Sequence, residues 1–392
     1  MCAMTKSIRT ILTPFLIISY VFGLRIVNLS KYSRLWFSVL YMLLLWSVYC
    51  ILSTSALISS FNELYPIEDS IFYWLESYTT LLSIVFGIYH EKKFQNCLRK
   101  LDIVDSTLFK LGTVTDYNKL RKKTVRLVLG WFMIVILTIY SVALSIKNEY
   151  NRDNATSIFY VLIRDYCFHI NFIGDLTTAS ILEYIGLKFD QINEHLQNLT
   201  RNNKRKIKQA WQKSRTHQYQ RRFSKTLNRK CIIWIITHLH LELRKISSEI
   251  DSIFGTQMTF KMACYFGWIV VDLREILNGI LINNYVKYWI TWVIIYFIWF
   301  SHNVSKFLLI NYMCETVSTK ASATADLLNR LSYFTRDNEI REIISQFSLR
   351  IVYAPLRFYG IGFFQFGFKF LHRFVMSIAT LLVIIIQAQG NK

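Results

Sequence analysis

The sequence predicts an all-α integral membrane protein with seven transmembrane helices, an amino terminus in the cytosol, a carboxyl terminus outside and a helical cytosolic anchor region. Two observations support this fold class. Of the 392 residues, 53% are hydrophobic and 16% aromatic, and the mean hydropathy is +0.28, which is outside the range of soluble domains. In addition, Lys and Arg concentrate in alternate loops between the apolar runs. We expect a single domain over residues 1–392.

Each span is predicted from an apolar run close to the roughly 20 residues that a helix needs to cross a bilayer. The first six predicted spans are residues 35–59, 71–90, 124–144, 158–187, 262–283 and 288–313. The seventh apolar run, residues 358–387, is interrupted by Lys369, His372 and Arg373. Charged groups are costly in the middle of a bilayer and are tolerated at the headgroups. We therefore expect residues 358–368 to belong to the anchor and residues 371–389 to cross the membrane.

The remaining segments are assigned to the cytosol. Residues 1–34 are expected to carry no cleaved signal peptide, and residues 11–26 to form a short amphipathic helix on the cytosolic face. Residues 188–257 and 314–370 are predicted to form the anchor, because apolar residues recur there at helical spacing in segments too polar to cross a membrane. The polar middle of the first anchor portion, residues 201–229, is predicted to be a mobile loop.

The orientation follows from the distribution of positive charge. One set of loops carries 5, 9, 15 and 6 Lys and Arg residues, and the opposite set carries 0, 2, 1 and 1. Because positive charge stays on the cytosolic side, this bias of 35 to 4 places the amino terminus inside. Seven spans then put Lys392 outside, the reverse of a G-protein-coupled receptor. The only sequon in a predicted outer loop is at Asn154, which is the expected glycosylation site.

Several other functions are disfavoured. The net charge of +21 and the basic run 204–208 suggest contact with anionic membrane lipids rather than nucleic acid, because no nucleic-acid recognition fold is indicated. His238 and His240 point to different sides of a helix, and no cluster has metal-ligand spacing, so no metal and no cofactor are expected. No catalytic motif suggests an enzyme. A membrane transporter stays open as an alternative, because the spans contain ionisable residues, although no internal repeat supports it.

A sparse polar stripe marks the last predicted span. Thr380 and Gln387 are seven residues apart, which is two helical turns, and Val383 and Ile384 lie between them on the same face. Such a face suits the wall of a narrow ion pore. It suits packing against a neighbouring helix equally well, and spacing alone does not separate the two interpretations.

At these residues the chain resembles the insect gustatory receptors. Residues 380–388 are similar to the closing signature of that family, although Leu381 and Ala388 stand where the family has Tyr and Phe. Residues 187–196, 314–328 and 357–364 also resemble family segments. The resemblance implies a seven-span chemoreceptor channel in which a cytosolic anchor holds four identical or related subunits around one central pore. It further implies a multi-pass protein in the plasma membrane of chemosensory neurons.

By this resemblance the chain is expected to be a ligand-gated, non-selective cation channel that senses a small-molecule tastant. Permeating cations would pass the last span, with Thr380, Val383, Ile384, Gln387 and Ala388 as the pore and gate residues. Ala388 has less apolar bulk than the phenylalanine of the family. Two alternatives therefore remain: the closed state leaks, or the chain relies on a co-receptor subunit. A bitter plant compound is the ligand class that the resemblance favours, and a sugar or an odorant-receptor-like role remains an alternative.

Aromatic and ionisable residues in the predicted spans are the candidates for ligand binding. They are Trp74, Glu76, Tyr78, Arg164, Asp165, His169, Asp272, Trp289 and Trp292. Aromatic planes with a few converging polar groups are typical of a pocket for a small amphipathic molecule. Carboxylates near tryptophan would accommodate a cationic alkaloid or a sugar. The alternative is an aromatic belt at the membrane interface, which places Trp and Tyr at the same depth without any ligand.

Overall fold

A computed structural model describes residues 7–24, 33–60, 67–150, 153–212, 219–282, 289–335 and 337–390 of the chain. Over these residues the chain is almost entirely helical. The helices are α1 (Ile8–Val21), α2 (Ser33–Ser60), α3 (Ile67–Lys110), α4 (Tyr117–Tyr150), α5 (Asn154–Arg164), α6 (Tyr166–Gln212), α7 (Tyr219–Leu281), α8 (Trp289–Tyr333), α9 (Asn338–Tyr353) and α10 (Phe368–Gly390). One short hairpin, β1 (Tyr359–Gly360) paired antiparallel with β2 (Phe364–Gln365), precedes α10.

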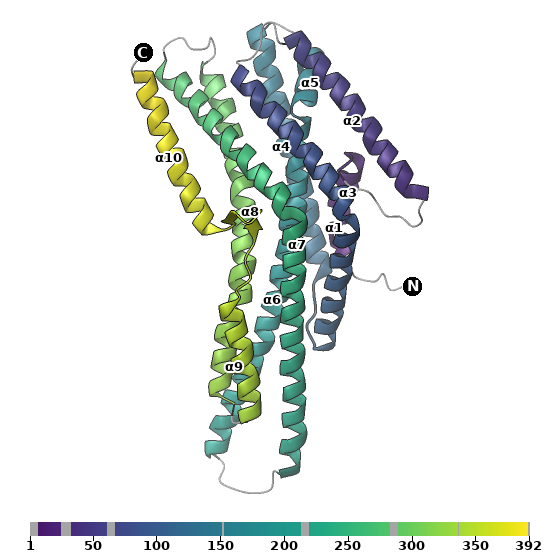
Figure 1. Cartoon of the computed structure of the whole chain (residues 1–392), viewed down its shortest axis with the longest axis vertical. Coiled ribbons are helices and arrows are strands. Elements are labelled where there is room, and N and C mark those ends of the chain that lie inside the picture. The colour runs from purple at the N-terminus through teal and green to yellow at the C-terminus, as the bar shows by residue number, and fades with distance from the viewer. Residues whose placement is uncertain are drawn as a thin grey trace.

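The longest helices join predicted spans to predicted anchor segments. α7 runs for 63 residues and α8 for 45 without a break, because neither contains a proline. In Figure 1 the lower halves of α6, α7 and α8 form a narrow bundle with α9, and the other helices spread around the upper half. α7 and α8 thus each continue without a break from a predicted span into a segment assigned to the anchor, and the anchor itself stays a prediction.

The anchor has its own apolar core. Leu196, Leu243, Leu328 and Ile344 each have 0% of their surface exposed, as the helical spacing of apolar residues predicted. His240 is buried among them, and its Nε2 lies 3.2 Å from the carbonyl oxygen of Ala321. Burial lowers the pKa of His240 to about 4, so the imidazole is neutral and belongs to the core.

The prediction of a mobile loop over residues 201–229 is wrong for most of that stretch. α6 continues to Gln212 and α7 begins at Tyr219, while residues 213–218 lie outside the described residues. The stretch contains neither glycine nor proline and is rich in Lys, Arg and Gln, which are good helix formers. The polarity of the stretch argues against burial in a core, but it does not argue against a helix.

The same helical extension bears on the expected role of the basic run 204–208. The run begins 17 residues beyond the predicted end of the fourth span at residue 187, which is about 25 Å along a helix. This distance is about three Debye lengths at physiological salt. Figure 1 places the ends of α6 and α7 at the far tip of the bundle, and contact between this run and lipid headgroups stays a prediction.

Two further predictions are corrected at the amino-terminal side of the bundle. The predicted fourth span, residues 158–187, is divided between α5 and α6 at Asp165, whose side chain is held by Arg164 at 2.8 Å. The predicted amphipathic helix corresponds to α1, but its apolar face packs on protein, with Ile8 and Phe15 fully buried. The Oγ of Ser7 donates a 2.8 Å hydrogen bond to Asp102 of α3, which fixes α1 on the bundle.

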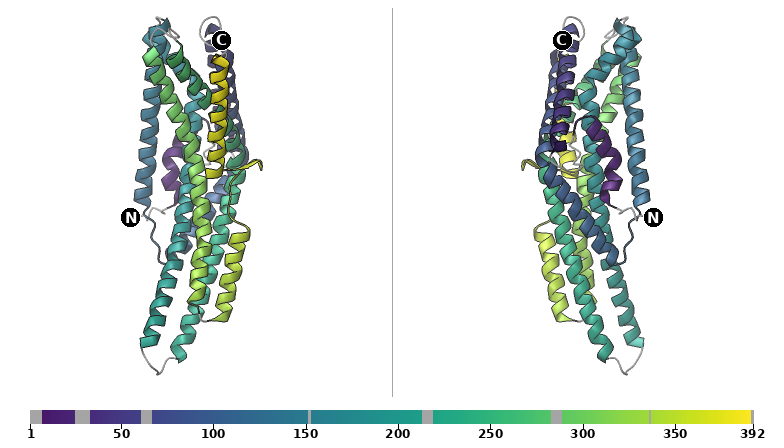
Figure 2. Two further views of the ribbon diagram at one scale, coloured as in Figure 1. Left: turned by 90° about the vertical axis from the view of Figure 1, so that its left-hand side faces the viewer. Right: turned by 90° about the vertical axis from the view of Figure 1, so that its right-hand side faces the viewer.

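The hairpin and the start of α10 are positioned by contacts with α7 and α8. Figure 2 shows the hairpin projecting from the side of the bundle at the lower end of α10. The hairpin is the one element of the described chain that an all-α prediction omitted. The N–H of Gly367 donates to Asn311 Oδ1 at 3.0 Å, and the N–H of Phe368 donates to Glu315 Oε2 at 3.3 Å. Side chains of α8 therefore cap the first turn of α10.

The predicted spans differ in how well they suit a membrane. Among the described residues, Tyr117–Lys147 and Trp289–Tyr333 are long and apolar enough to cross one, and Ile8–Val21 and Val39–Ser55 are shorter apolar helices. The other runs include charged residues that lie inside the bundle, such as Glu76 and Asp175. The number of spans and the orientation of the termini remain predictions.

Candidate functional site

A polar face of α6 lies at the centre of the upper bundle. Asn171 and Phe172 lie three and four residues after Phe168 and four and three residues before Asp175, so the four residues share one side of the helix. Their exposed fractions are 5%, 1%, 8% and 0%. Two aromatic rings, one amide and one carboxylate thus face the interior together, and we call this set the α6 face.

α3 contributes a carboxylate to the α6 face. Glu76 is 3% exposed, and the Nδ2 of Asn171 donates a 2.7 Å hydrogen bond to its Oε1. The same Nδ2 lies 2.8 Å from the hydroxyl of Thr80. Because a buried carboxylate is stable only with donors around it, Asn171 is the group that allows Glu76 to remain in the interior.

α7 contributes a cation that has two hydrogen-bond acceptors. The Nζ of Lys261 donates to Asp175 Oδ1 at 2.8 Å and to the carbonyl oxygen of Asn171 at 2.9 Å. The hydroxyl of Tyr265 donates to the second oxygen of Asp175. Both oxygens of this buried carboxylate are therefore occupied, which is the condition for a buried ion pair to be tolerated.

α8 contributes a second cation, which has no hydrogen-bond partner. The Nζ of Lys306 lies 3.1 Å from the ring centroid of Phe168, 5.5 Å from that of Phe172 and 5.3 Å from that of Tyr265. Lys306 is 0% exposed, and no donor of its ammonium is satisfied. A desolvated cation–π contact is worth about 2 kcal/mol, which offsets only part of the cost of burying an ammonium.

Other side chains at this level also have unused hydrogen-bonding atoms. They are Glu76 Oε2, His169 Nδ1, Asn171 Oδ1 and His302 Nε2. The ring of His302 packs on Phe168 and Phe172, with centroids 5.3 and 4.9 Å apart. Buried polar atoms are nearly always paired in native proteins. Several unpaired atoms beside one aromatic wall therefore make this interior the candidate binding site.

The structure brings some predicted ligand-binding residues into this interior. Glu76, Asp165, His169 and Asp272 are all buried. Asp165 is held by Arg164, whose guanidinium lies 5.4 Å from the ring centroid of Tyr73. Asp272 accepts a 2.9 Å hydrogen bond from Asn303. These carboxylates already have partners within the chain, which weakens the expectation that they receive a cationic alkaloid.

The aromatic candidates lie mostly elsewhere. Trp74, Tyr78 and Trp289 have 55%, 54% and 52% of their surface exposed, on the outside of the bundle. Trp292 is half-buried and packs on Tyr296, with ring centroids 4.9 Å apart. Trp74, Tyr78 and Trp289 therefore do not join the buried polar groups of this interior, and their role in ligand binding stays a prediction.

Sequence reasoning placed Asn171 near the expected pocket but missed Lys306 and His302 as site residues. Lys306 lies inside the predicted sixth span, but its charge was counted with the adjoining cytosolic loop. An ionisable residue within an apolar run is itself a functional signal, and this signal was available for Lys306. No sequence signal would have paired Asn171 with Glu76, because the two residues lie on different helices and are 95 residues apart in the chain.

The polar stripe of α10 is not covered by the rest of the chain. Thr380, Val383, Ile384 and Gln387 are exposed, whereas Phe374 is buried and Ile378, Leu381 and Leu382 are half-buried against the bundle. Phe374 stacks on Phe307 of α8 with ring centroids 3.7 Å apart. Packing of the stripe against a helix of the same chain is therefore excluded for these residues. The side chain of Ala388 lies outside the described residues.

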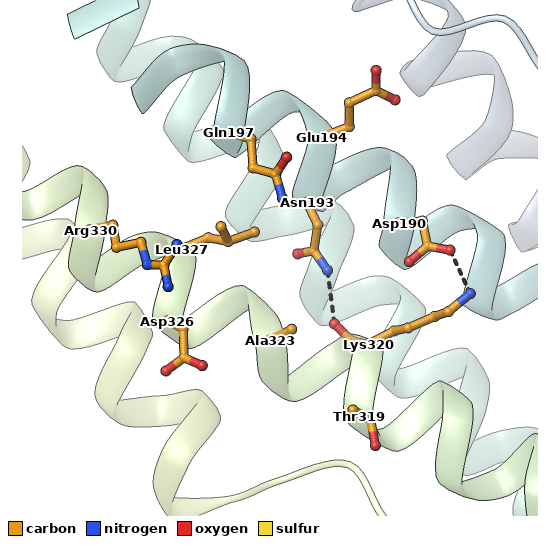
Figure 3. Close-up of a pocket in the computed structure, with 10 residues that line it drawn as sticks. All are labelled: Asp190, Asn193, Glu194, Gln197, Thr319, Lys320, Ala323, Asp326, Leu327 and Arg330. Atoms are coloured by element: carbon orange, nitrogen blue, oxygen red, sulfur yellow. Dashed lines mark hydrogen bonds and ion pairs between the residues drawn. The ribbon is translucent and has the colours of Figure 1, made fainter. Parts of the chain in front are cut away.

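A second, polar cleft lies in the anchor between α6 and α8 (Figure 3), with a volume of about 450 Å³. Asp190 pairs with Lys320, and the Nδ2 of Asn193 donates to the carbonyl oxygen of Lys320 at 2.9 Å. The hydroxyl of Thr324 donates to Asn193 Oδ1 at 2.7 Å. The lining residues lie between 190 and 197 on α6 and between 319 and 330 on α8, so the two segments that resemble gustatory receptors, 187–196 and 314–328, contact each other here.

The long helical bundle, the polar interior near its upper end and the uncovered helix α10 together define a receptor-like helical membrane protein. The model of the 7tm chemosensory receptor family matches residues 12–389. The chain belongs to this family, which confirms the family suggested by its last span.

Comparisons with individual proteins also identify chemosensory receptors as similar to this chain. The gustatory and pheromone receptor 32a of Drosophila melanogaster is 30% identical over 91 residues, which are 23% of this chain and 19% of that protein. The olfactory receptor OR5 of Machilis hrabei has a similar fold, with a TM-score of 0.62 and 12% identity over 97% of this chain and 98% of the other. The structure of OR5 in complex with eugenol is equally similar, with a TM-score of 0.62 and 14% identity over the same shares.

Proposed function

We propose that this chain is a gustatory receptor that works as a ligand-gated, non-selective cation channel. The main support is the uncovered stripe of α10, whose exposed Thr380, Val383 and Gln387 face away from the bundle of their own chain. A membrane helix with a free polar stripe needs a partner, and copies of the same helix around an axis provide one. Four identical or related subunits then surround one pore, through which cations pass.

The ligand binds at the α6 face, around Glu76, Asn171 and Lys306, in this proposal. The structure of OR5 with eugenol supports a small organic ligand for a protein of this fold. A bitter plant compound is the tastant class that we propose from the resemblance, and a sugar is the alternative. The protein lies in the plasma membrane of chemosensory neurons, with seven spans and the carboxyl end outside.

A short connection links the ligand site to the pore. Lys306 is followed in the chain by Phe307, whose ring stacks on Phe374 of α10. Further along α8, Asn311 and Glu315 hold the first residues of α10. A ligand that shifts Lys306 and its part of α8 therefore moves the base of the pore helix, and the gate opens when this movement separates the aliphatic side chains near Val383.

Cysteine modification tests the pore. Val383→Cys and Gln387→Cys should make ligand-evoked current sensitive to a charged methanethiosulfonate reagent, because both side chains face the permeation path. Leu382→Cys is the matched control, since Leu382 is half-buried towards the bundle and should be insensitive. Saturable flux without channel openings, together with equal sensitivity at all three positions, would instead favour a transporter.

A further inference from the structure

The ionised groups at the α6 face are unequally satisfied. Asp175 has both oxygens occupied, by Lys261 and Tyr265, and Lys261 has two acceptors. Lys306 has none, although its ammonium is enclosed by Phe168, Phe172 and Tyr265. An ammonium carries three donors, and leaving them empty in an apolar interior is costly.

The carboxylates of this interior do not provide hydrogen-bond acceptors for Lys306. Neither Glu76 nor Asp175 forms a hydrogen bond with the Nζ of Lys306. Each oxygen of Asp175 already accepts a hydrogen bond, one from Lys261 and one from Tyr265. Glu76 keeps one oxygen, Oε2, without a partner. The site therefore combines an ammonium without an acceptor, that of Lys306 over the ring of Phe168, and a carboxylate oxygen without a donor, Oε2 of Glu76, whose other oxygen is bound by Asn171 of the same α6 face.

The chemistry of a ligand that fits this site follows from Lys306 and Glu76. A carboxylate satisfies Lys306 with charge-assisted hydrogen bonds, and a donor next to that carboxylate satisfies Glu76. The aromatic rings of Phe168, Phe172 and Trp299 supply the wall for an apolar side chain, with Trp299 and Phe168 only 4.7 Å apart between centroids. A simple cation would satisfy Glu76 alone and would be repelled by Lys306.

We propose that the ligand of this site is an amphipathic α-amino or α-hydroxy acid, whose carboxylate binds the ammonium of Lys306 and whose adjacent amino or hydroxyl group donates to Glu76. This inference rests on the proposed function for the location of the site and deepens it by naming the ligand class. It replaces the cationic alkaloid suggested by the sequence, because the structure leaves the cation, rather than the carboxylates Asp165 and Asp272, without partners.

Four probes that differ in one group each test the ligand class. They are phenylalanine, phenyllactate, 3-phenylpropionate, which lacks the donor, and 2-phenylethylamine, which lacks the carboxylate. Calcium responses of cells expressing the full chain should be strongest for the first two, weaker for 3-phenylpropionate and weakest for the amine. An amine that is as effective as the acids overturns the proposal.

Substitution of Lys306 assigns the effect to the proposed contact. Lys306→Met should raise the half-maximal concentration for phenyllactate about 10- to 100-fold, the range for loss of a charge-assisted hydrogen bond. Lys306→Arg should retain most of the response because it keeps the charge. Ile294→Ala, an exposed position on the same helix, should leave the response unchanged. A response of Lys306→Met equal to that of the unsubstituted chain overturns the proposal.

Thermal unfolding of the purified full chain separates ligand binding from channel function and from a structural role. Phenyllactate should raise the Tm of the unsubstituted protein and leave that of Lys306→Met unchanged. The ligand-free variant should be at least as stable as the parent, because an unsatisfied buried charge has been removed; a lower Tm would assign Lys306 a structural role and overturn the proposal. An acid that raises the Tm without evoking current rejects the proposed channel function alone. A chain that conducts with the amine but neither binds nor responds to the acids rejects this inference alone.

Discussion

Both carboxylate oxygens of Asp251, on α7, accept the backbone N–H of Tyr359, at 3.1 and 3.2 Å. The contact fixes the first strand of the hairpin that leads into α10. It is reinforced by Gly255, one helical turn later, where an added Cβ would lie only 2.9 Å from the carbonyl oxygen of Tyr359. α10 is therefore attached at its base to α7 as well as to α8.

The first prediction concerns the charge of Asp251. Burial raises its pKa to about 6, against the opposing effect of the Tyr359 hydrogen bond. Because the folded-state pKa lies above the ordinary value of about 3.9, the ionised form costs stability above pH 6, and this cost disappears as the pH falls from 6 towards 4. Asp251→Asn should raise the Tm at pH 7.4 and weaken the pH dependence of the Tm in that window.

The control for this prediction is Asp326→Asn, an exposed carboxyl on α8, which should leave the Tm nearly unchanged at both pH values. A lower Tm for Asp251→Asn at pH 7.4 would show that the negative charge is needed to hold the hairpin.

The second prediction concerns the entry into α10. Gly367 has a φ of 134°, and a Cβ there would lie 2.2 Å from the Oε2 of Glu315. Gly367→Ala should therefore destabilise the protein by roughly 1–3 kcal/mol and reduce ligand-evoked current by displacing the base of the pore helix. Thermal unfolding and patch-clamp recording measure the two effects.

Gly130→Ala on α4 is the matched control, because nothing lies within 4 Å of its added Cβ. This change should be neutral or stabilise the helix by up to about 1 kcal/mol. Equal effects of the two substitutions would contradict the capping role of Glu315.

The third prediction concerns the support of Glu76. Asn171→Leu removes the donor to Glu76 and leaves its carboxylate buried without that hydrogen bond, which should cost about 3–5 kcal/mol in the free energy of unfolding. Asn198→Leu on the same helix is exposed and should cost far less. A small effect of Asn171→Leu would mean that Glu76 is protonated or reaches another donor.

The fourth prediction concerns topology. Asn154 is exposed at the start of α5, whereas Asn303 is 1% exposed and inaccessible to glycosylation. Asn154→Gln should abolish any glycosidase-sensitive mobility shift, and an epitope tag after Lys392 should label on intact cells. A shift that persists and maps to Asn198 would invert the predicted orientation around α6.

The sequence predicted the long helices and the anchor core well, because helical spacing of residues such as Leu243 and Leu328 is a local property of the chain. It failed where the outcome depends on contacts between distant helices. Glu76, Trp74 and Tyr78 were grouped by their common depth, but Glu76 lies on the inward side of α3 and the two aromatic residues lie on its outward side. The break at Asp165 was also missed, because an apolar run gives no information about a local ion pair with Arg164.

The candidate pore is the reverse case. The spacing of Thr380, Val383 and Gln387 predicted a common face, and the structure leaves that face uncovered. The cation at Lys306 could be found only after the structure showed which charges already have partners.

The most direct test of the central claim, that α10 lines a cation pore, is the relative permeability of ligand-evoked currents in chains altered at Gln387. Gln387→Ala should change ion selectivity or conductance, and Ala388→Phe should lower the ligand-free current by adding apolar bulk at the gate. Leu382→Ala, about 100° around the helix from Val383, should affect expression or stability more than permeation. Unchanged selectivity and conductance in Gln387→Ala, with normal surface expression, would contradict the account and assign the stripe to contacts between helices.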